Sequence, residues 1–246
     1  MILVTNDDGI HSKGIIILAK ALQEIGSIFV VAPDSEQSAV AHSLTLHRPL
    51  RVEKIKKNFY AVDGTPADCI HLGVNAILPK RPRLIVSGIN KGGNLADDII
   101  YSGTVSAAFE GTLLGIPSFA ISLVSRSHFK FDVAARFALK VARYIMRRGL
   151  PRNTFLNINV PNLDEKEIKS YKITQQGKLI HDGGGVIEKV DPRGRKYYWI
   201  GGREMIFDKG RNTDVEAVSK SYISITPFSL DLTNYSSIRE LKKWRI

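Results

Sequence analysis

Short apolar runs alternate with segments of helical periodicity along the first two-thirds of the chain. The apolar runs have the length and composition of strands that are buried on both faces, and they cover residues 2–5, 27–33, 83–88, 118–123 and 155–160. Helical periodicity follows at residues 14–25, 66–78, 105–114 and 132–148. Strands that alternate with helices in this way predict an α/β fold with a mainly parallel sheet flanked by helices.

The pattern differs in two other regions. Residues 50–55 and 59–62 predict two short strands joined by a turn. From about residue 169, strand-like segments and turns predict an antiparallel β-extension; the strands are at 171–174, 196–200 and 222–226, and the turns at 183–185, 191–194 and 201–202. We expect a protruding hairpin around the turn at 191–194 and a short terminal helix at 236–244. The expected organisation is one domain, 1–246, with a core of about 1–165 and a β-extension and tail of about 166–246.

Polar residues interrupt the pattern directly after the first apolar run. Asn6, Asp7, Asp8 and Gly9 have the chemistry of a turn. In open α/β sheets, ligands bind outside the carboxyl ends of the strands, which is where the two acids should lie. Adjacent carboxylates repel each other, and a divalent cation such as Mg²⁺ offsets this repulsion. Because Asp-Gly turns are common, an acidic turn without a metal is the alternative.

Two further polar segments follow predicted strands. Residues 34–47 match neither a helix nor a strand and form a candidate ligand loop. The segment after the third strand is rich in Gly, Asn, Asp and Ser, and it ends in Ser102-Gly103-Thr104 at a predicted helix start. Free N–H groups, the helix dipole and two hydroxyls suit a phosphate at that position. Simple N-capping by Ser102 or Thr104, with nothing bound, is the alternative.

The helix predicted from Pro66 begins with strong local signals. Thr65 suits the N-cap, Pro66 suits the first helical position, and Asp68 favours the positive end of the helix. We interpret Thr65 as a capping residue. His71 falls inside this helix, and we expect it to be structural and not a metal ligand.

Composition narrows the protein class. The 246 residues are 43% hydrophobic and 24% charged, as in a soluble globular protein, and no apolar run approaches the ~18 residues of a membrane span. The N-terminus lacks the features of a signal peptide. Cys69 is the one cysteine, which excludes an internal disulfide and indicates a reducing compartment. We therefore expect a cytoplasmic location and no membrane partner.

The formal net charge of +11 raises the question of a polyanionic partner. The positive charges are scattered, however, and those at 136, 140, 143 and 147 recur at helical spacing as a solvated face would. No basic stretch with interleaved aromatic residues matches a nucleic-acid motif. We expect no nucleic-acid partner, and we attribute the charge to solubility and to attraction of small anions.

Seven segments together identify a family resemblance. In chain order they are I-L-V-T-N-D-D-G, V-V-A-P-D-x-x-x-S, T-P-A-D-C, S-G-I-N-x-G-x-N, Y-S-G-T-V, L-N-I-N-V-P and Y-I-S-I-T-P. This series resembles the SurE family, the stationary-phase survival protein nucleotidases, as far as about Pro227. The resemblance implies a Rossmann-like sheet and a metal-dependent phosphatase acting on nucleoside 5′- or 3′-monophosphates, with some members trimming short polyphosphate. It also implies homodimers or homotetramers built by the C-terminal extension and tail.

The resemblance assigns roles residue by residue. It implies that one divalent ion per subunit, Mg²⁺ or Mn²⁺, is bound by Asp7, Asp8, Ser38 and Asn90. The residues it implies on the phosphate side are Asn6, Asn94, Ser102, Gly103, Thr104 and Ser106. Some relatives carry histidines after S-I-T-P, but Ser229, Asp231 and Tyr235 stand in that region here. A general acid from the tail is therefore in doubt.

The expected reaction is phosphomonoester hydrolysis by metal-activated water, with Asp7 and Asp8 as catalytic residues and Asp8 also orienting the water. One rival mechanism is a covalent aspartyl-phosphate with Asp7 as nucleophile, although that class normally shows D-x-D. A rival of another class is a receiver-like or nucleotide-binding module without turnover. Receivers need an aspartate at the end of a later strand, and the segment 87–90, Ser-Gly-Ile-Asn, supplies none.

Overall fold

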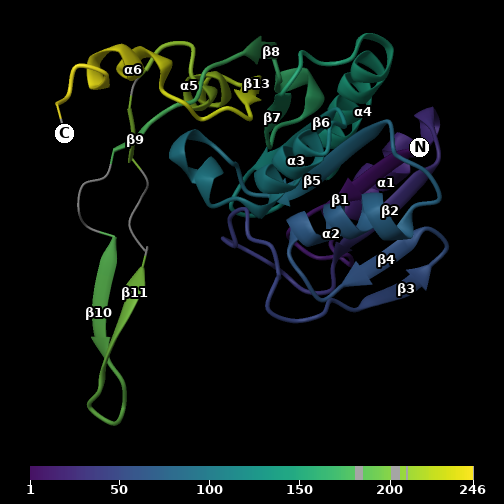
Figure 1. The fold of residues 1–246 in the computed structure, drawn as a ribbon, viewed down its shortest axis with the longest axis horizontal. Helices are drawn as coiled ribbons and strands as arrows, with labels where there is room; N and C mark the ends of the chain where they lie inside the picture. The colour runs from purple at the N-terminus through teal and green to yellow at the C-terminus, as the bar shows by residue number, and fades with distance from the viewer. Residues whose placement is uncertain (181–184, 201–205, 209, 246) are drawn as a thin grey trace.

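The central feature of the computed structural model is a mainly parallel sheet (Figure 1). The structure describes residues 1–180, 185–200, 206–208 and 210–245. Within these residues the sheet has nine strands in the order β3-β4-β2-β1-β5-β6-β7-β13-β8. Their bounds are β1 Ile2–Thr5, β2 Ile28–Pro33, β3 Val52–Lys56, β4 Phe59–Val62, β5 Leu84–Lys91, β6 Ser118–Val124, β7 Thr154–Pro161, β8 Ser170–Ile173 and β13 Tyr222–Ser229. The pairs β4–β2, β2–β1, β1–β5, β5–β6 and β6–β7 are parallel, which confirms the predicted α/β class.

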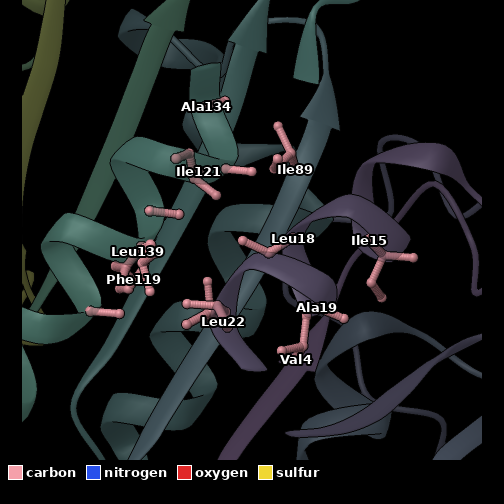
Figure 2. Close-up of a cluster of buried hydrophobic side chains, with 14 of the residues drawn as sticks. Val4, Ile15, Leu18, Ala19, Leu22, Ile89, Phe119, Ile121, Ala134 and Leu139 are labelled. Carbon is pink, nitrogen blue, oxygen red and sulfur yellow. The ribbon is translucent and has the colours of Figure 1, made fainter. Parts of the chain in front are cut away.

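Helices cover both faces of the sheet because successive side chains of a strand point to opposite faces. Ile2 and Val4 of β1 belong to the core beneath α1 (Lys13–Leu22) and α4 (Phe131–Arg148). Leu3 belongs to a second core with residues of α2 (Pro66–Leu72) and α3 (Gly103–Leu113). Figure 2 shows the first core, where Leu18 and Leu22 of α1 lie near Phe119 and Ile121 of β6. No helix among the described residues is long and apolar enough to cross a membrane.

The helices agree closely with the predicted segments. α2 (Pro66–Leu72) continues as a π-helical turn over Gly73–Ile77, so the helical segment ends close to the predicted residue 78. Thr65 accepts from Asp68 N at 3.1 Å, and Asp68 Oδ2 accepts from Thr65 N at 2.9 Å. This reciprocal pair is a capping box, and it confirms the interpretation of Thr65 as a cap. α3 (Gly103–Leu113) begins two residues before the predicted start.

The C-terminal segment contributes to the sheet as well as to an extension. β13 pairs antiparallel with β7 and parallel with β8, and its Ile223 and Ile225 are buried in the core under α4. The change in sequence pattern near residue 169 therefore does not mark the end of the central sheet. Without β13, β7 would be an edge strand with unpaired backbone N–H and C=O groups. The pairing with β13 covers that edge.

The predicted hairpin projects from the body of the molecule (Figure 1). β10 (Val186–Val190) pairs antiparallel with β11 (Lys196–Ile200), and the short pair β9 (Leu179–Ile180) and β12 (Ile206–Phe207) lies at its base. The turn between β10 and β11 is the one predicted at 191–194. Apart from residue 185, the turns predicted at 183–185 and 201–202 lie outside the described residues.

Two short helices complete the C-terminal segment. α5 (Asp214–Ser219) was not predicted, because six residues are too few to show helical periodicity. α6 (Tyr235–Leu241) confirms the terminal helix in a shorter form than the predicted 236–244.

Candidate active site

A cavity of about 350 Å³ lies where the loops after β1, β2 and β5 meet. These three strands are adjacent and parallel, so their carboxyl ends lie at one edge of the sheet. The four residues predicted as metal ligands all line this cavity: Asp7, Asp8, Ser38 and Asn90. Its other lining residues are Glu36, Ala39, Lys91, Gly93, Asn94, Asp98, Tyr101 and Ser102. The structure thus brings together segments that are more than 80 residues apart in the chain.

The turn after β1 is held by Asn6 and Gly9. Asn6 is fully buried, and its Nδ2 donates to Gly9 O at 3.0 Å and to Ser12 Oγ at 2.8 Å. Gly9 has φ +89°, and a Cβ there would lie 3.3 Å from the Ser35 carbonyl carbon. Asn6 does not line the cavity and its amide donors are used within the turn. Its role as a phosphate donor therefore stays a prediction.

Asp7 is a buried acid held by the N-terminus of α3. Its Oδ1 accepts from Thr104 Oγ1 at 2.5 Å, and its Oδ2 accepts from Thr104 N at 3.0 Å. Burial raises the pKa of Asp7 to about 6, and the charge of Asp8 adds to this rise while the Thr104 hydrogen bonds oppose it. Ionisation of Asp7 therefore costs more in the protein than in water, and a bound cation would offset that cost.

Asp8 has a different environment from Asp7. Its Oδ2 accepts from Lys91 N at 3.2 Å, and its Oδ1 lies 3.8 Å from Lys91 Nζ. Burial raises the pKa of Asp8, and the charge of Lys91 opposes the rise. Asp8 is therefore paired with a partly exposed lysine side chain, whereas Asp7 is held by a helix terminus.

A distortion in β5 places Asn90 in the cavity. The register between β5 and β6 shifts between Gly88 and Asn90, and such bulges redirect side chains next to functional sites. A Cβ on Gly88 would lie 2.3 Å from the Ile121 carbonyl oxygen, so the strands approach too closely there for any other residue. Asn90 Nδ2 donates to Gly92 O at 3.0 Å, and the amide oxygen is the atom that suits a cation.

Ser38 reaches the cavity from the loop after β2. Backbone bonds tie this loop to its neighbours, from Gln37 N to Asp7 O at 2.8 Å and from Ala41 N to Tyr101 O at 3.0 Å. Ser38 Oγ donates to Glu36 Oε1 at 2.6 Å, which leaves its oxygen lone pairs able to bind a cation. The same loop carries His42, whose Nε2 lies 2.9 Å from Glu110 Oε2 on α3.

Glu110 also contacts the histidine that we expected to be structural. His71 Nδ1 lies 3.3 Å from Glu110 Oε1, so one carboxyl joins His71 of α2 to His42 of the loop. The hydrogen bond with His42 lowers the pKa of Glu110, and His71 adds to this effect. This contact links the loop that carries Ser38 to the helix that holds Asp7.

The predicted phosphate-side residues around α3 divide into two groups. Ser102 lines the cavity, and its Oγ accepts from Val105 N at 3.1 Å, so it is the N-cap of α3. Gly103, Thr104 and Ser106 do not line the cavity. Thr104 is occupied with Asp7, and Ser106 Oγ donates to Ser102 O at 2.7 Å. Their direct contact with a phosphate stays a prediction, and in this structure they support Asp7 and the cap.

Two asparagines that the sequence analysis left without a role hold Asn94 at the cavity. Asn157 and Asn159 of β7 are fully buried, and both donate to Asn94 O, at 2.8 and 2.9 Å. Asn159 Oδ1 also accepts from Asn94 N at 2.8 Å, and Asn94 Nδ2 donates to Ser122 Oγ at 2.7 Å. Alternate asparagines in an otherwise apolar strand were the available signal, because buried amides need hydrogen-bond partners.

The acid of the C-terminal tail is unsuited to donate a proton. Hydrogen bonds from Thr233 and Tyr235 lower the pKa of Asp231 to about 2, so it is ionised near neutral pH. Asp231, Ser229 and Tyr235 are not among the described residues that line the cavity. The doubt about a general acid from the tail is consistent with this arrangement.

The chemistry of the cavity suits a hard cation. Within the residues that the structure describes, no group of three or more His, Cys, Asp or Glu is arranged to hold a metal ion. A cation here would be held by two carboxylates and two neutral oxygens, from Ser38 and Asn90. Mg²⁺ and similar ions are bound in this way, through one or two carboxylates with water and phosphate in the remaining positions. The residues present therefore fit a single divalent ion.

Comparison with known proteins extends the argument from these residues to the whole chain. The profile of the family described as "Survival protein SurE" matches residues 2–182. The chain is 55% identical to a protein of Geobacter sulfurreducens named 5′-nucleotidase SurE, over 99% of this chain and 93% of that protein. It is 53% identical to a protein of Geotalea uraniireducens with the same name, over 99% of this chain and 98% of the other.

The fold agrees with these matches. The crystal structure of the SurE protein from Aquifex aeolicus superimposes with a TM-score of 0.87 and 46% sequence identity, covering 98% of both chains. This likeness confirms the resemblance inferred from the seven sequence motifs. The chain belongs to the SurE family.

Proposed function

We propose that this protein is a metal-dependent 5′-nucleotidase, a phosphomonoesterase that hydrolyses nucleoside 5′-monophosphates. The observation that carries the proposal is the meeting of Asp7, Asp8, Ser38 and Asn90 in one cavity at the carboxyl ends of three adjacent strands. The relatives named 5′-nucleotidase, more than half identical over nearly the whole chain, support the same activity. Hydrolysis of 3′-monophosphates and of short polyphosphate is part of the proposal as a secondary activity.

The proposed cofactor is one Mg²⁺ or Mn²⁺ ion per subunit, held by Asp7, Asp8, Ser38 and Asn90. When bound, such an ion supplies Lewis acidity toward water and toward a phosphoryl oxygen. The two carboxylates would balance its charge, so the ligand set itself would present no excess negative charge to a phosphate dianion. The 350 Å³ cavity leaves room for the phosphate beside the four ligands.

Other residues of the chain orient the reacting groups. Thr104 holds both oxygens of Asp7, and we propose that Asp8 orients the attacking water as well as binding the ion. Ser102 lies at the N-terminus of α3, where the positive end of the helix dipole favours the negative charge of a phosphate. Asn94, fixed by the asparagines of β7, lines the same cavity.

Chelation followed by metal addition tests the proposal. Hydrolysis of nucleoside 5′-monophosphates should stop after exhaustive chelation and return with Mg²⁺ or Mn²⁺. Full activity with no residual metal would contradict it. The alternative of a binding module without turnover predicts metal and nucleotide binding but no released phosphate in the same assay.

The same assay in ¹⁸O-labelled water separates direct attack by water from the aspartyl-phosphate mechanism. In a single turnover, direct attack puts the label into phosphate and none into the protein. Label in the side chain of Asp7 or Asp8 would overturn the proposed mechanism and leave the phosphatase activity standing.

The proposal also includes a homo-oligomer, a dimer or a tetramer, in the cytoplasm. The hairpin β10–β11 carries large apolar side chains that the described residues leave exposed: Val186, Val190, Tyr198, Trp199 and Ile200. Exposed apolar patches of this kind mark association surfaces. The cytoplasmic location is proposed from the cysteine content. Cys69 is the one cysteine and is buried, so the chain cannot form an internal disulfide, as suits a reducing compartment.

A further inference from the structure

Lys91 brings a positive charge into the proposed metal site. Among the described residues that line the cavity, four are acidic and only Lys91 is basic. The acidic residues are Asp7, Asp8, Glu36 and Asp98. Lys91 follows Asn90 at the end of β5, and the family resemblance gave it no role.

The backbone of Lys91 is held by the sheet, whereas its side chain is partly exposed. Its Cα pairs with Leu123 of β6, and its N–H donates to Asp8 Oδ2 at 3.2 Å. Lys91 Nζ lies 3.8 Å from Asp8 Oδ1, too far for a direct hydrogen bond. The side chain of Lys91 is 40% exposed, whereas that of Asp8 is 9% exposed. The ammonium group therefore compensates the charge of Asp8 without being locked to it.

We propose that Lys91 has two successive partners in this cavity. Without a metal ion, its ammonium group neutralises Asp8; once a divalent cation binds Asp8, the same group binds an oxygen of the substrate phosphate. This inference rests on the proposed phosphomonoesterase function and adds a substrate-binding residue to it.

Charge balance drives the exchange of partners. A divalent cation neutralises the two carboxylates, and it repels the ammonium group that stood beside Asp8. A phosphate dianion that enters the cavity would then bring further negative charge to a lining in which Lys91 is the one basic residue among those described. The long flexible side chain of a lysine allows such a movement while its backbone stays in place.

The proposal predicts opposite effects of one substitution on two ligands. Lys91→Met keeps an unbranched side chain and removes the charge, so metal and ammonium no longer compete for Asp8. Mn²⁺ should bind the metal-free variant about two- to fivefold more tightly, the range of a partly exposed ion pair. Inorganic phosphate should bind the Mn²⁺-loaded variant about tenfold more weakly, because a charge-assisted hydrogen bond is lost.

Calorimetric titration measures both affinities without relying on turnover. Lys140→Met on α4 is the matched control, because it removes one positive charge from an exposed side chain that does not line the cavity. Lys91→Arg should restore most of the phosphate affinity. The KM for a nucleoside monophosphate should rise in Lys91→Met more than kcat falls.

Each outcome decides the question. Phosphate affinity in Lys91→Met equal to that in Lys140→Met would overturn the proposal, and so would a loss of both affinities, which indicates a structural role. If the wild-type protein binds Mn²⁺ and hydrolyses nucleotides, and Lys91→Met behaves like the Lys140→Met control, this inference alone is refuted. A wild-type protein without metal-dependent hydrolysis would refute the proposed function itself.

Discussion

At the scale of single residues, Asp7 shows a conflict between stability and the proposed chemistry. It is only 7% exposed, and its carboxyl accepts two hydrogen bonds from Thr104, yet burial still raises its pKa to about 6. Ionisation of Asp7 therefore costs more in the folded protein than in the unfolded chain, whereas metal binding requires the carboxylate. Such unfavourable buried groups are typical of functional sites.

Asp7→Asn should stabilise the metal-free protein in a pH-dependent way. The folded pKa of about 6 exceeds the unfolded value of 3.8, so the contribution of Asp7 to wild-type stability should fall as pH rises from about 4 to about 6. The asparagine of the variant does not titrate, so the variant does not lose this stability. Its amide can still form a hydrogen bond with Thr104 by donating to the hydroxyl. Its advantage should grow from near zero at pH 4 to at most about 3 kcal/mol at pH 8, measured by urea unfolding in chelator.

Asp63→Asn is a control with the opposite sign. A hydrogen bond from Arg51 N lowers the pKa of Asp63, so its carboxylate stabilises the fold above its unfolded pKa, and this stability is lost as pH falls. Removing Asp63 should therefore not stabilise the protein at pH 8. A pH-independent advantage of Asp7→Asn would show that a cause other than ionisation is responsible.

At the scale of elements, the site depends on strands that do not line it. β7 carries Asn157 and Asn159 on one face, and both contact the backbone of Asn94 in the loop after β5. β6 adds Ser122, which accepts from the Asn94 side chain. Buried hydrogen bonds to a loop backbone give that loop a single conformation, so the sheet itself orders this wall of the cavity.

Asn159→Leu should be more damaging than Asn157→Leu. Asn159→Leu removes two hydrogen bonds to Asn94 and leaves the Asn94 N–H without its Asn159 acceptor. The free energy of unfolding should fall by about 2–4 kcal/mol. Asn157→Leu removes one hydrogen bond to Asn94, and it also removes the buried Asn157 Oδ1, which has no hydrogen-bond partner. The free energy of unfolding should therefore fall by only about 1 kcal/mol. Urea unfolding and the metal-dependent kcat/KM of both variants check this order. Equal losses would contradict the role of Asn159 as the main support.

At the scale of the whole molecule, the hairpin stands apart from the body of the protein (Figure 1). Trp199 and Ile200 at its base are 60% and 92% exposed. A two-stranded ribbon is marginally stable in water without further packing. We therefore expect the hairpin to pack against another subunit.

Substitution of the hairpin residues tests the proposed assembly. Trp199→Ser with Ile200→Ser should shift the protein toward monomers in sedimentation velocity at micromolar concentration, because the buried apolar area in the interface is reduced. Leu113→Ser, an exposed leucine on α3, is the control and should leave the oligomer unchanged. A wild-type monomer, or an unchanged oligomer in the double variant, would exclude the hairpin as the contact.

Local signals in the sequence were sufficient for most of the fold. The cap at Thr65, the alternation of apolar runs with helices, and the hairpin turn at 191–194 each depend on residues close together in the chain. The two acids of the candidate site were found in the same way, because a strand that ends in Asp7 and Asp8 has a recognisable local pattern. Ser38 and Asn90 came from the family resemblance, since a single serine or asparagine in a polar loop carries no distinguishing local signal.

Only the tertiary structure decided which residues surround those acids. Thr104 lies 97 positions from Asp7, Lys91 lies 83 positions from Asp8, and Asn159 lies 65 positions from Asn94. The placement of β13 between β7 and β8 is equally nonlocal. Contacts of this kind follow from the order of strands in the sheet, which the periodicity of a segment does not encode. The sequence by itself therefore determined the elements and the acidic pair, and strand order determined the hydrogen bonds and charges that set their chemistry.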